Sequence, residues 1–440
     1  MKTIQINPLD NVAVALTPIA KGESVTAGEY TVIAGGDIPQ GHKIALKKIE
    51  KDTNIIKYGF PIGHATEEIE AGNWVHSHNM ATNLEGEVEY TYQPAITPVT
   101  PAEPETFNGF RRKDGRAAIR NEIWIIPTVG CVNDVAKRMV QMNQDLVKGT
   151  IDGLYTFDHP FGCSQTGADH AQTRKLLAAL VRHPNAAAVL VLGLGCENLT
   201  HEQFLEELGD YDSDRVKFLT CQEVEDEFEE GRKLLEQCAE YAGQFHREPI
   251  PVSELVVGMK CGGSDGLSGI TANPTVGRFS DMMAARGGST VLTEVPEMFG
   301  AEGFLMNRCI NKEVFDKAVN MINGFKNYFI SHHEVVYDNP SPGNRQGGIT
   351  TLEDKSCGCV QKGGSAPIMD VIGYGDPVVT KGLNMLYGPG NDLVSATAMT
   401  AAGAHMILFT TGRGTPFGAP APTLKLATNS QLAANKKNWI

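Results

Sequence analysis

From Asn108 onward, the sequence alternates short apolar runs with longer amphipathic stretches, and this alternation constrains the fold more than any other feature. Two examples are IWIIPTVG followed by DVAKRMVQMNQDLV, and AAVLVLGLG followed by HEQFLEEL. Short apolar runs of this kind predict buried strands, and the amphipathic stretches predict helices. Because strands that alternate with helices favour a parallel sheet, we expect an α/β fold with mostly parallel sheets here.

The first 92 residues differ, because short alternating apolar segments are broken there by Gly, Pro and Asn. VAVAL, YTVIA, KIALKKI, NIIKYG and EVEYTY predict a small all-β domain. A proline-rich segment over 93–106 predicts an extended linker, and HREPIPVS over 246–253 marks a second break. The expected units are therefore 1–92 (all-β domain), 93–106 (linker), 107–247 (α/β domain) and 248–440 (second α/β domain).

Composition excludes several classes of protein. The chain has 38 Lys and Arg against 52 Asp and Glu, a formal charge of -14, which disfavours nucleic acid as a partner. The first residues lack a basic segment followed by an apolar one, and the uncharged run 186–194 is too short to cross a bilayer. We expect a cytoplasmic protein with no membrane contact, whose nine cysteines are thiols or metal ligands rather than disulfides.

Four glycine-flanked cysteines follow predicted strands: Cys131, Cys163, Cys196 and Cys261. Open α/β sheets bind ligands at the carboxyl ends of their strands, and glycine allows close backbone approach there. Taken singly, each cysteine is more often a small buried apolar residue. If three or four converge, they could hold an iron ion or an iron–sulfur cluster, although none has C-x-x-C spacing. The CGC pair Cys357 and Cys359 is a weaker metal signal.

The all-β domain contains two histidine motifs. His42 and Lys43 lie in GHK, and His76 and His78 lie in WVHSHN. Residues two apart on a strand share a face, so His76 and His78 could share a metal ion or a proton. The alternative is a polar strand end with two exposed histidines.

The last domain is rich in polar loops that follow predicted strands. CGGSDGLSGITANP could grip the hydroxyls and carboxylate of a polyol acid through Ser264, Asp265, Ser268, Thr271 and Asn273. Arg413, in TTGRGTPFG, could clamp a substrate carboxylate, and Glu294, Glu297 and Glu302 could hold a metal or act as a base. Asn391 and Asp392 add a further polar loop. Ordinary solvated loops and helix starts are the alternative for all of them.

These motifs together resemble the altronate and galactarate dehydratase family, which also includes sulfolactate sulfo-lyase. The resemblance rests on GHKIAL, KYGFPIGHA, VHSHN, RRKDGRAAIRN, IPTVGCVN, GCSQTGAD, LGLGCEN, KCGGSDGLSGITANP, LTEVPE, SPGN, DKSCGCVQKGG and TTGRGTPFG, and it covers essentially the whole chain. It implies an N-terminal SAF-type β-clip domain and a larger α/β catalytic region. It also implies residues beyond the position of Ile440.

The implied activity is a hydro-lyase reaction in hexuronate catabolism, the dehydration of D-altronate to 2-dehydro-3-deoxy-D-gluconate, with Fe2+ or Mn2+ as cofactor. VHSHN favours altronate over galactarate, because galactarate dehydratases carry an acidic, histidine-poor segment there. Galactarate dehydratase, a sulfolactate sulfo-lyase-like enzyme and a sugar-acid binding protein without activity are the alternatives. A homodimer is the expected assembly.

Dehydration requires removal of the C2 proton and departure of hydroxide from C3. We expect catalytic roles for His42, Lys43, His76 and His78, with Lys43 as the base. Ser264, Asp265, Ser268, Thr271, Asn273 and Arg413 would bind the substrate. The candidate metal ligands, not all in one site, are Cys131, Cys163, Cys196, Cys261, Glu197 and Glu294.

Overall fold

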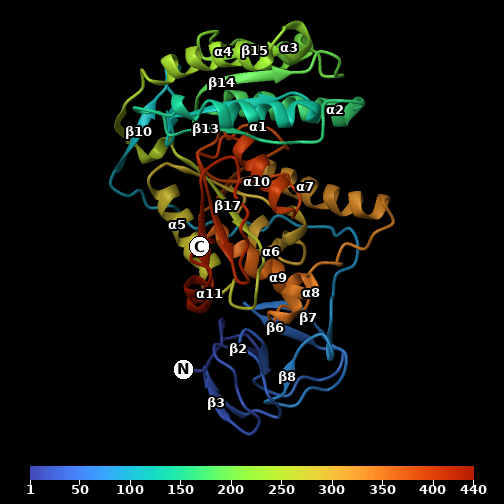
Figure 1. The fold of residues 1–440 in the computed structure, drawn as a ribbon. Helices are drawn as coiled ribbons and strands as arrows, with labels where there is room; N and C mark the ends of the chain where they lie inside the picture. Colours follow the sequence, from blue (N-terminus) through green and yellow to red (C-terminus); the bar gives the residue numbers. More distant parts are fainter.

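The computed structural model describes residues 1–440 and divides them into an N-terminal β-domain, a middle α/β domain and a C-terminal α/β domain (Figure 1). The β-domain, blue in Figure 1, consists of three small antiparallel sheets with the strand orders β1-β2-β5-β8, β3-β4 and β6-β7-β9. Its strands are β1 (Thr3–Ile4), β2 (Val12–Ala15), β3 (Ser24–Ala27), β4 (Tyr30–Ile33), β5 (Lys43–Ala45), β6 (Asn54–Lys57), β7 (Phe60–Ala65), β8 (Trp74–Val75) and β9 (Met80–Ala81).

The β-domain does not bury all its apolar residues within itself. Ile19 and Ile38 belong to a core of its own, whereas Ile55, Ile62 and Val75 belong to the same apolar cluster as buried residues of the C-terminal domain. Each of these side chains is at most 2 % exposed. The apolar face of β6 and β7 therefore fixes the β-domain against the C-terminal domain.

No helix or strand occurs between β9 and the next strand, so residues 82–105 form the connection to the middle domain. The segment EVEYTY, expected among the strands, forms none. The Tyr90 hydroxyl donates to Glu302 at 2.8 Å, and the Tyr92 hydroxyl donates to the carbonyl of Cys309 at 2.8 Å. Side-chain bonds to the C-terminal domain thus replace the sheet pairing that the alternation suggested.

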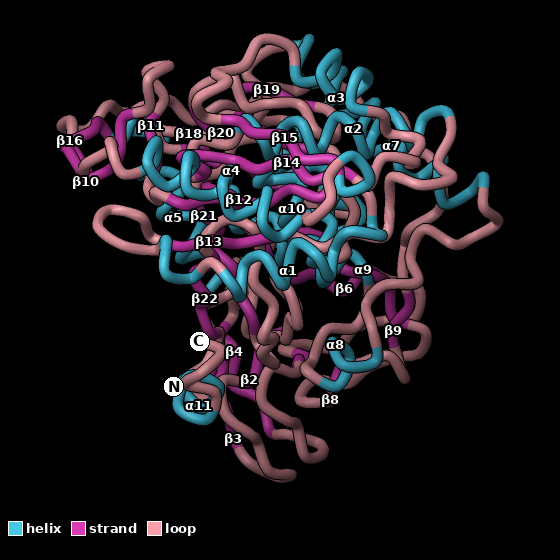
Figure 2. Tube along the Cα trace, turned by 45° about the horizontal axis from the view of Figure 1, so that its top comes forward, coloured by secondary structure: helices cyan, strands magenta, loops and turns pink.

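A three-stranded antiparallel sheet joins the segments that enter and leave the middle domain. It has the order β11-β10-β16 and lies at one side of the molecule (Figure 2). Its strands are β10 (Thr106–Arg111), β11 (Ala117–Ala118) and β16 (Arg247–Pro251). The register pairs Thr106 with Pro251 and Phe110 with Arg247, so both ends of the middle domain are held together.

The middle domain is built on a parallel four-stranded sheet with the order β13-β12-β14-β15. The strand β14 is buried at seven of its eight positions, which explains its continuous apolar sequence. The strands are β12 (Glu122–Pro127), β13 (Gly153–Thr156), β14 (Ala186–Gly193) and β15 (Val216–Thr220), and the helices are α1 (Asn133–Met142), α2 (Gly167–Arg182), α3 (His201–Leu208) and α4 (Glu227–Ala242).

The C-terminal domain has a parallel six-stranded sheet with the order β19-β20-β18-β17-β21-β22. The strands are β17 (Val256–Cys261), β18 (Ser289–Leu292), β19 (Ile368–Ile372), β20 (Gly382–Leu386), β21 (Met406–Thr411) and β22 (Thr423–Ala427). The helices are α5 (Ala272–Ala285), α6 (Glu302–Met306), α7 (Lys312–Ser331), α8 (Pro342–Gln346), α9 (Leu352–Cys359), α10 (Asp392–Ala401) and α11 (Ser430–Asn435), with three 3-10 turns, η4 (Val252–Glu254), η5 (Val295–Met298) and η6 (Val360–Gly363).

The predicted fold class is confirmed, with a small all-β domain followed by an α/β region whose two large sheets are parallel. None of the helices has the length and apolar character needed to cross a membrane. The carboxyl ends of β17, β18 and β21 meet at one edge of the C-terminal sheet, where an open α/β sheet places its ligand site.

Candidate active site

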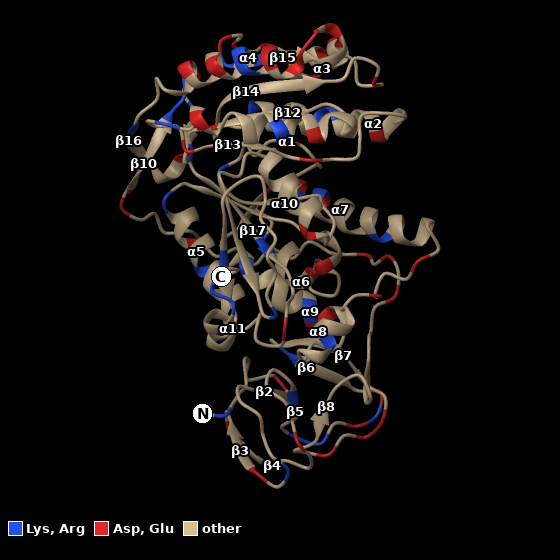
Figure 3. Ribbon diagram, in the orientation of Figure 1, with Lys and Arg blue, Asp and Glu red and all other residues tan.

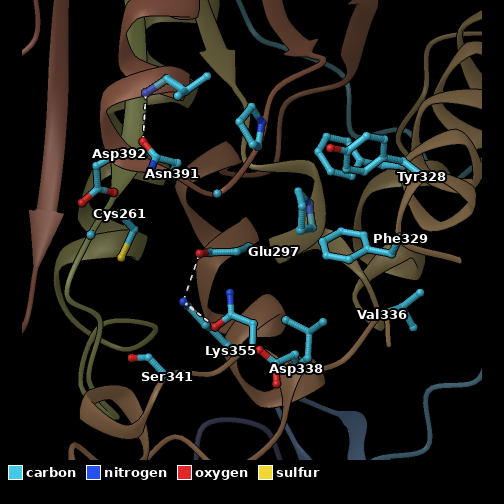
Figure 4. Close-up of a pocket in the computed structure, with 18 of the residues that line it drawn as sticks. Cys261, Glu297, Tyr328, Phe329, Val336, Asp338, Ser341, Lys355, Asn391 and Asp392 are labelled. Carbon is cyan, nitrogen blue, oxygen red and sulfur yellow. Dashed lines mark hydrogen bonds and ion pairs between the residues drawn. The ribbon is translucent and has the colours of Figure 1, made fainter. Parts of the chain in front are cut away.

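A cavity of about 880 Å³ opens beside this edge and combines an apolar wall with a polar floor (Figure 4). The volume is within the range of small-molecule sites. The apolar wall comes mainly from α7 and the loop after it, with Phe325, Tyr328, Phe329 and Val336. The polar lining includes Gln172, Cys261, Glu297, Asp338, Asn339, Ser341, Asn344, Lys355, Asn391 and Asp392.

Buried lysines and carboxylates pair beneath this floor. Lys260 contacts Glu294 and lies 3.0 Å from an Asp392 oxygen, and Lys362 donates to the other Glu294 oxygen at 2.9 Å. The side chains of Lys260, Lys362 and Glu294 are fully enclosed. Buried charges of this kind are stable only when paired, so these three side chains form one unit.

Glu297 and Lys355 continue the network to the cavity surface. Lys355 Nζ lies 3.0 Å from Glu297 Oε1, and the Cys359 sulfur lies 3.2 Å from Glu297 Oε2. Burial raises the pKa of Glu297, but the charges of Lys355, Lys260 and Lys362 outweigh it and lower that pKa to about 2. Lys355 also donates to the side-chain oxygens of Asn339 and Asn344, at 3.0 and 3.2 Å.

Cys261 brings a thiol into the same network at the end of β17. Its sulfur lies 2.8 Å from Ser264 Oγ. Hydrogen bonding with Cys359 and the charge of Lys362 lower the pKa of Cys261. These two effects outweigh burial, which raises it, and the resulting pKa is about 6. The same hydrogen bond raises the pKa of Cys359. The pair therefore holds one thiolate, on Cys261, near neutral pH.

Local structure explains how these side chains meet. Lys260 and Cys261 end the apolar strand β17, and Glu297 lies in the turn η5, whose preceding residue Glu294 has left-handed backbone with φ 70°. Lys355 and Cys359 are four residues apart on α9 and therefore share a face of the helix. We name the side chains of Lys260, Cys261, Glu294, Glu297, Lys355, Cys359 and Lys362 the lysine–carboxylate–thiol cluster.

The donors of this cluster do not fit the divalent metal that the family resemblance implies. Glu294, Glu297 and Cys359 each present a ligand atom, and these atoms lie within 4.8 Å of one another. However, each of these side chains already accepts from or pairs with a lysine ammonium. A cation would have to displace these ammonium groups, because three positive charges already compensate the buried negative ones.

His42 and His76 lie together in the β-domain, against α8 rather than at the cavity. Their ring centroids are 4.8 Å apart, and their Nε2 atoms donate to the carbonyls of Gln346 and Arg345. Their Nδ1 atoms accept from Trp74 Nε1 and from the Ser77 amide. All four ring nitrogens are thus engaged, and neither ring offers a free lone pair to a metal.

His78 is exposed and packs its ring against Trp74, with centroids 5.2 Å apart. Lys43, the predicted base, is fully enclosed and donates to Asp354 at 2.8 Å and to the carbonyl of Gly348 at 2.9 Å. Burial, opposed by Asp354, lowers the pKa of Lys43 to about 8. Because Lys43 does not line the cavity, its catalytic role stays a prediction from sequence.

The predicted substrate-binding loop lies next to the cluster, but its polar side chains are engaged in hydrogen bonds within the protein. Asp265 accepts from Ser268 Oγ and from Thr428 Oγ1, and Thr271 Oγ1 donates to the carbonyl of Leu267. Asn273 donates to the carbonyl of Gly358 at 2.9 Å.

Arg413 donates to Gln346 Oε1 at 2.9 Å, beside the cavity-lining Gly263. Of the predicted substrate-binding loop and its cysteine, only Cys261 and its neighbouring glycines reach the cavity.

The other predicted metal ligands form a separate set. Cys131, Cys163, Cys196 and Glu197 follow strands of the middle domain, whereas Cys261 and Glu294 belong to the C-terminal domain. Glu197 accepts from Thr128 Oγ1 at 2.8 Å and from the amides of Leu194 and Gly195, so its carboxylate holds its own loop.

Sequence reasoning missed Lys260, Lys355 and Lys362. A lysine inside the apolar run ELVVGMKC was the available signal for Lys260, since an unpaired lysine is rarely buried in a strand. Nothing comparable marked Lys355 and Lys362, because DKSCGCVQKGG has the composition of a polar helix end.

Three family models match successive parts of the chain. Residues 1–83 match the altronate/galactarate dehydratase SAF domain, residues 109–243 match the D-galactarate dehydratase/altronate hydrolase second domain, and residues 252–440 match the D-galactarate/altronate dehydratase C-terminal domain.

Curated relatives agree with these matches over nearly the whole length. Altronate dehydratase of Escherichia coli (strain K12) is 53% identical over 100% of this chain and 90% of its own length. Altronate dehydratase of Bacillus subtilis (strain 168) is 53% identical over 99% and 88%, respectively. Galactarate dehydratase (L-threo-forming) of Escherichia coli is 34% identical over 98% and 85%. The chain belongs to the altronate and galactarate dehydratase family.

Proposed function

We propose that this protein dehydrates D-altronate to 2-dehydro-3-deoxy-D-gluconate as a cytoplasmic hydro-lyase of hexuronate catabolism. The observation that carries the proposal is the 53% identity to two altronate dehydratases over essentially the full chain, against 34% to a galactarate dehydratase. The chemistry of the cavity agrees with it, because the reaction needs a base, an acid and a cationic contact for the substrate carboxylate.

Lys355 is the group that we assign to the substrate carboxylate and the leaving hydroxyl. It is the one lysine of the cluster that lines the cavity, and its bonds to Asn339 and Asn344 orient it toward the polar floor. The chain as a whole is negatively charged, with carboxylates gathered over α3 and α4 (Figure 3). A local ammonium is therefore needed to attract a sugar acid.

Cys261 is the base that the geometry favours over Lys43. It lines the cavity, whereas Lys43 is sealed behind Asp354. A base works best when its pKa lies near the working pH, which favours Cys261 over the strongly ionised Glu297. The Cys261 thiolate takes the C2 proton, the electron pair forms the C2–C3 double bond, and the C3 hydroxyl leaves with a proton from Lys355. The resulting enol tautomerises to the 2-keto-3-deoxy acid.

Purified protein offered D-altronate, galactarate or sulfolactate in parallel tests the proposal. We expect the 2-keto-3-deoxy acid from D-altronate with the highest kcat/KM. Cys261→Ser should abolish both turnover and exchange of the C2 proton with deuterium oxide, whereas the matched Cys221→Ser variant, whose sulfur does not line the cavity, should retain both. Preference for galactarate or sulfolactate would overturn the substrate assignment, and normal exchange in Cys261→Ser would overturn the base.

A further inference from the structure

Three of the nine cysteines are exposed, and all three lie at one edge of the middle domain. Cys131 follows β12, Cys163 follows β13 and Cys196 follows β14, which are three neighbouring parallel strands. The other six cysteines are buried or half-buried. Because free cysteine is normally a buried apolar residue, three exposed thiols at one sheet edge call for a chemical explanation.

The three cysteine loops are bonded to one another through their backbones. The Gly130 amide, beside Cys131, donates to the carbonyl of Phe161 at 2.9 Å. The residues on both sides of Cys163 bond to Asn198, which is two residues from Cys196: the Asn198 amide donates to the Gly162 carbonyl at 3.1 Å, and Asn198 Oδ1 accepts from the Ser164 amide at 2.6 Å. Each thiol is therefore within two residues of a direct contact with a neighbouring loop.

The loops are also fixed in unusual conformations around the thiols. Ser164 has φ 59° although it is not glycine, and Gly162 has φ 99° where a Cβ would lie 2.1 Å from the Thr128 carbonyl oxygen. Glu197 binds the Gly195 amide at 2.6 Å and thereby holds the turn that carries Cys196. The loops that carry Cys163 and Cys196 are thus held in defined conformations, with local backbone strain at Ser164.

A single ion and a cluster place different demands on the distances between thiols. Two sulfurs bound to one ion at about 2.3 Å cannot be more than about 4.6 Å apart. Glu294, Glu297 and Cys359 form the one group of at least three such ligands whose atoms all lie within 4.8 Å of one another. The three exposed thiols do not form such a group. In an iron–sulfur cluster each cysteine binds a different iron, so the sulfurs need not lie that close together.

We propose that Cys131, Cys163 and Cys196 bind a cubane iron–sulfur cluster through three irons and leave the fourth iron open. Thiolates are the ligands that select such clusters. The three sulfurs belong to free, exposed cysteines. An open iron supplies Lewis-acid chemistry to a hydroxyl group. This part of the inference rests on the proposed dehydratase function, whereas binding of the cluster does not.

The position of the loops connects them to the cavity. Cys163 lies four residues before α2, and Gln172 of that helix lines the 880 Å³ cavity while donating to the Tyr374 carbonyl at 3.3 Å. In Figure 1, β14 points toward the side of the molecule on which α7, the source of the apolar wall, extends. A cluster at this edge would lie on the side of the middle domain that faces the substrate site.

The test is anaerobic reconstitution of the full chain with ferrous iron and sulfide, followed by iron and acid-labile sulfide analysis, visible absorption and electron paramagnetic resonance after reduction. Cys131→Ser, Cys163→Ser and Cys196→Ser are compared with Cys221→Ser, whose half-buried sulfur follows β15 at the same edge but packs on the apolar core. Thermal unfolding of each variant checks the fold.

We expect wild type and Cys221→Ser to bind about four irons and four sulfides, and each of the other three variants to lose most of the cluster while unfolding at the wild-type temperature. Iron without sulfide, or equal cluster content in all five proteins, would overturn the proposal. Turnover of D-altronate distinguishes the proposed dehydratase function from the proposed binding of a cluster. A cluster without turnover contradicts the proposed function alone, and full turnover in cluster-free variants contradicts the catalytic use of the cluster alone.

Discussion

Lys260, Lys355 and Lys362 determine which groups of the cavity floor are charged. Their ammonium groups contact Glu294, Glu297 and Cys359 directly. The charges of all three lysines lower the pKa of Glu297, and the charge of Lys362 helps to lower the pKa of Cys261. Burial favours the neutral form of a carboxyl or thiol group unless an opposite charge lies nearby. The protonation of the side chains that line the cavity is therefore influenced by Lys260 and Lys362, which do not line it themselves.

Lys355→Met should lower kcat/KM for D-altronate at least about 100-fold, because it removes both the carboxylate contact and the proton donor. Steady-state kinetics measure this, with Lys437→Met, an exposed lysine, as the matched control that should behave like wild type. Less than about a tenfold loss in Lys355→Met would remove this lysine from the mechanism.

The pH dependence of kcat/KM should report the Cys261 thiol. Its pKa is lowered to about 6, so the thiolate is present above pH 6 and is protonated below it. We therefore expect kcat/KM to rise with pH and to level off above about pH 7. A profile recorded from pH 5 to pH 8 tests this, and a rate that does not fall toward pH 5 would contradict a thiolate base.

At the scale of elements, the β-domain is fixed by buried ion pairs to α9. Asp354 accepts from Lys43 at 2.8 Å and from Lys57 at 2.9 Å, and all three side chains are at most 2% exposed. Lys43 is on β5 and Lys57 is on β6, so one carboxylate joins two strands of the β-domain to the C-terminal domain.

Asp354→Asn should lower the free energy of unfolding by about 3–5 kcal/mol, because it leaves two buried ammonium groups without a carboxylate. The matched control is Asp316→Asn, which removes an exposed partner of Lys312 and should cost at most about 1 kcal/mol. Urea unfolding measures both. Equal, small losses would mean that the β-domain does not depend on this ion pair.

The contact of the β-domain with α8 should weaken on mild acidification. Burial first, and then the charges of Lys43 and His42, lower the pKa of His76 to about 4 from an ordinary 6.5. The contribution of this neutral histidine is fully present above pH 6.5 and is lost as the pH falls toward 4. We expect the melting temperature to fall over this range less in His76→Gln, whose amide can still donate to Arg345, than in wild type. An identical fall in both proteins would contradict this assignment.

Sequence periodicity identified the strands and helices that carry the site but not the contacts between them. The apolar run before Cys261 predicted a buried strand, and β17 is that strand. His42, by contrast, bonds to Gln346, and Lys43 bonds to Asp354. Periodicity holds no information about such long-range pairs, so the histidines were expected at the reacting centre rather than at a domain contact.

At the scale of the whole molecule, the alternation of strands and helices was enough to predict the α/β architecture, because both large sheets are parallel and connected by helices. The antiparallel pairing of β10 with β16 was not predictable in the same way, since its partners are separated by the entire middle domain. The sequence also predicted reactive thiols at strand ends, but the structure divides them between two domains.

The three domains contribute different parts of the proposed dehydratase. The C-terminal domain supplies the cavity with the proposed base and ammonium, the middle domain supplies Gln172 to its lining and carries three exposed thiols, and the β-domain braces α8 and α9. Such an enzyme must act on a sugar acid small enough for an 880 Å³ cavity.

The most direct test is to follow formation of the 2-keto-3-deoxy acid from D-altronate by anaerobically reconstituted wild-type protein, together with Lys355→Met and Lys437→Met. Rapid turnover by wild type and Lys437→Met, with at least about a 100-fold loss in Lys355→Met, is the predicted result. Turnover that survives in Lys355→Met would place the reaction outside this cavity, and no product from wild type would contradict the dehydration of altronate itself.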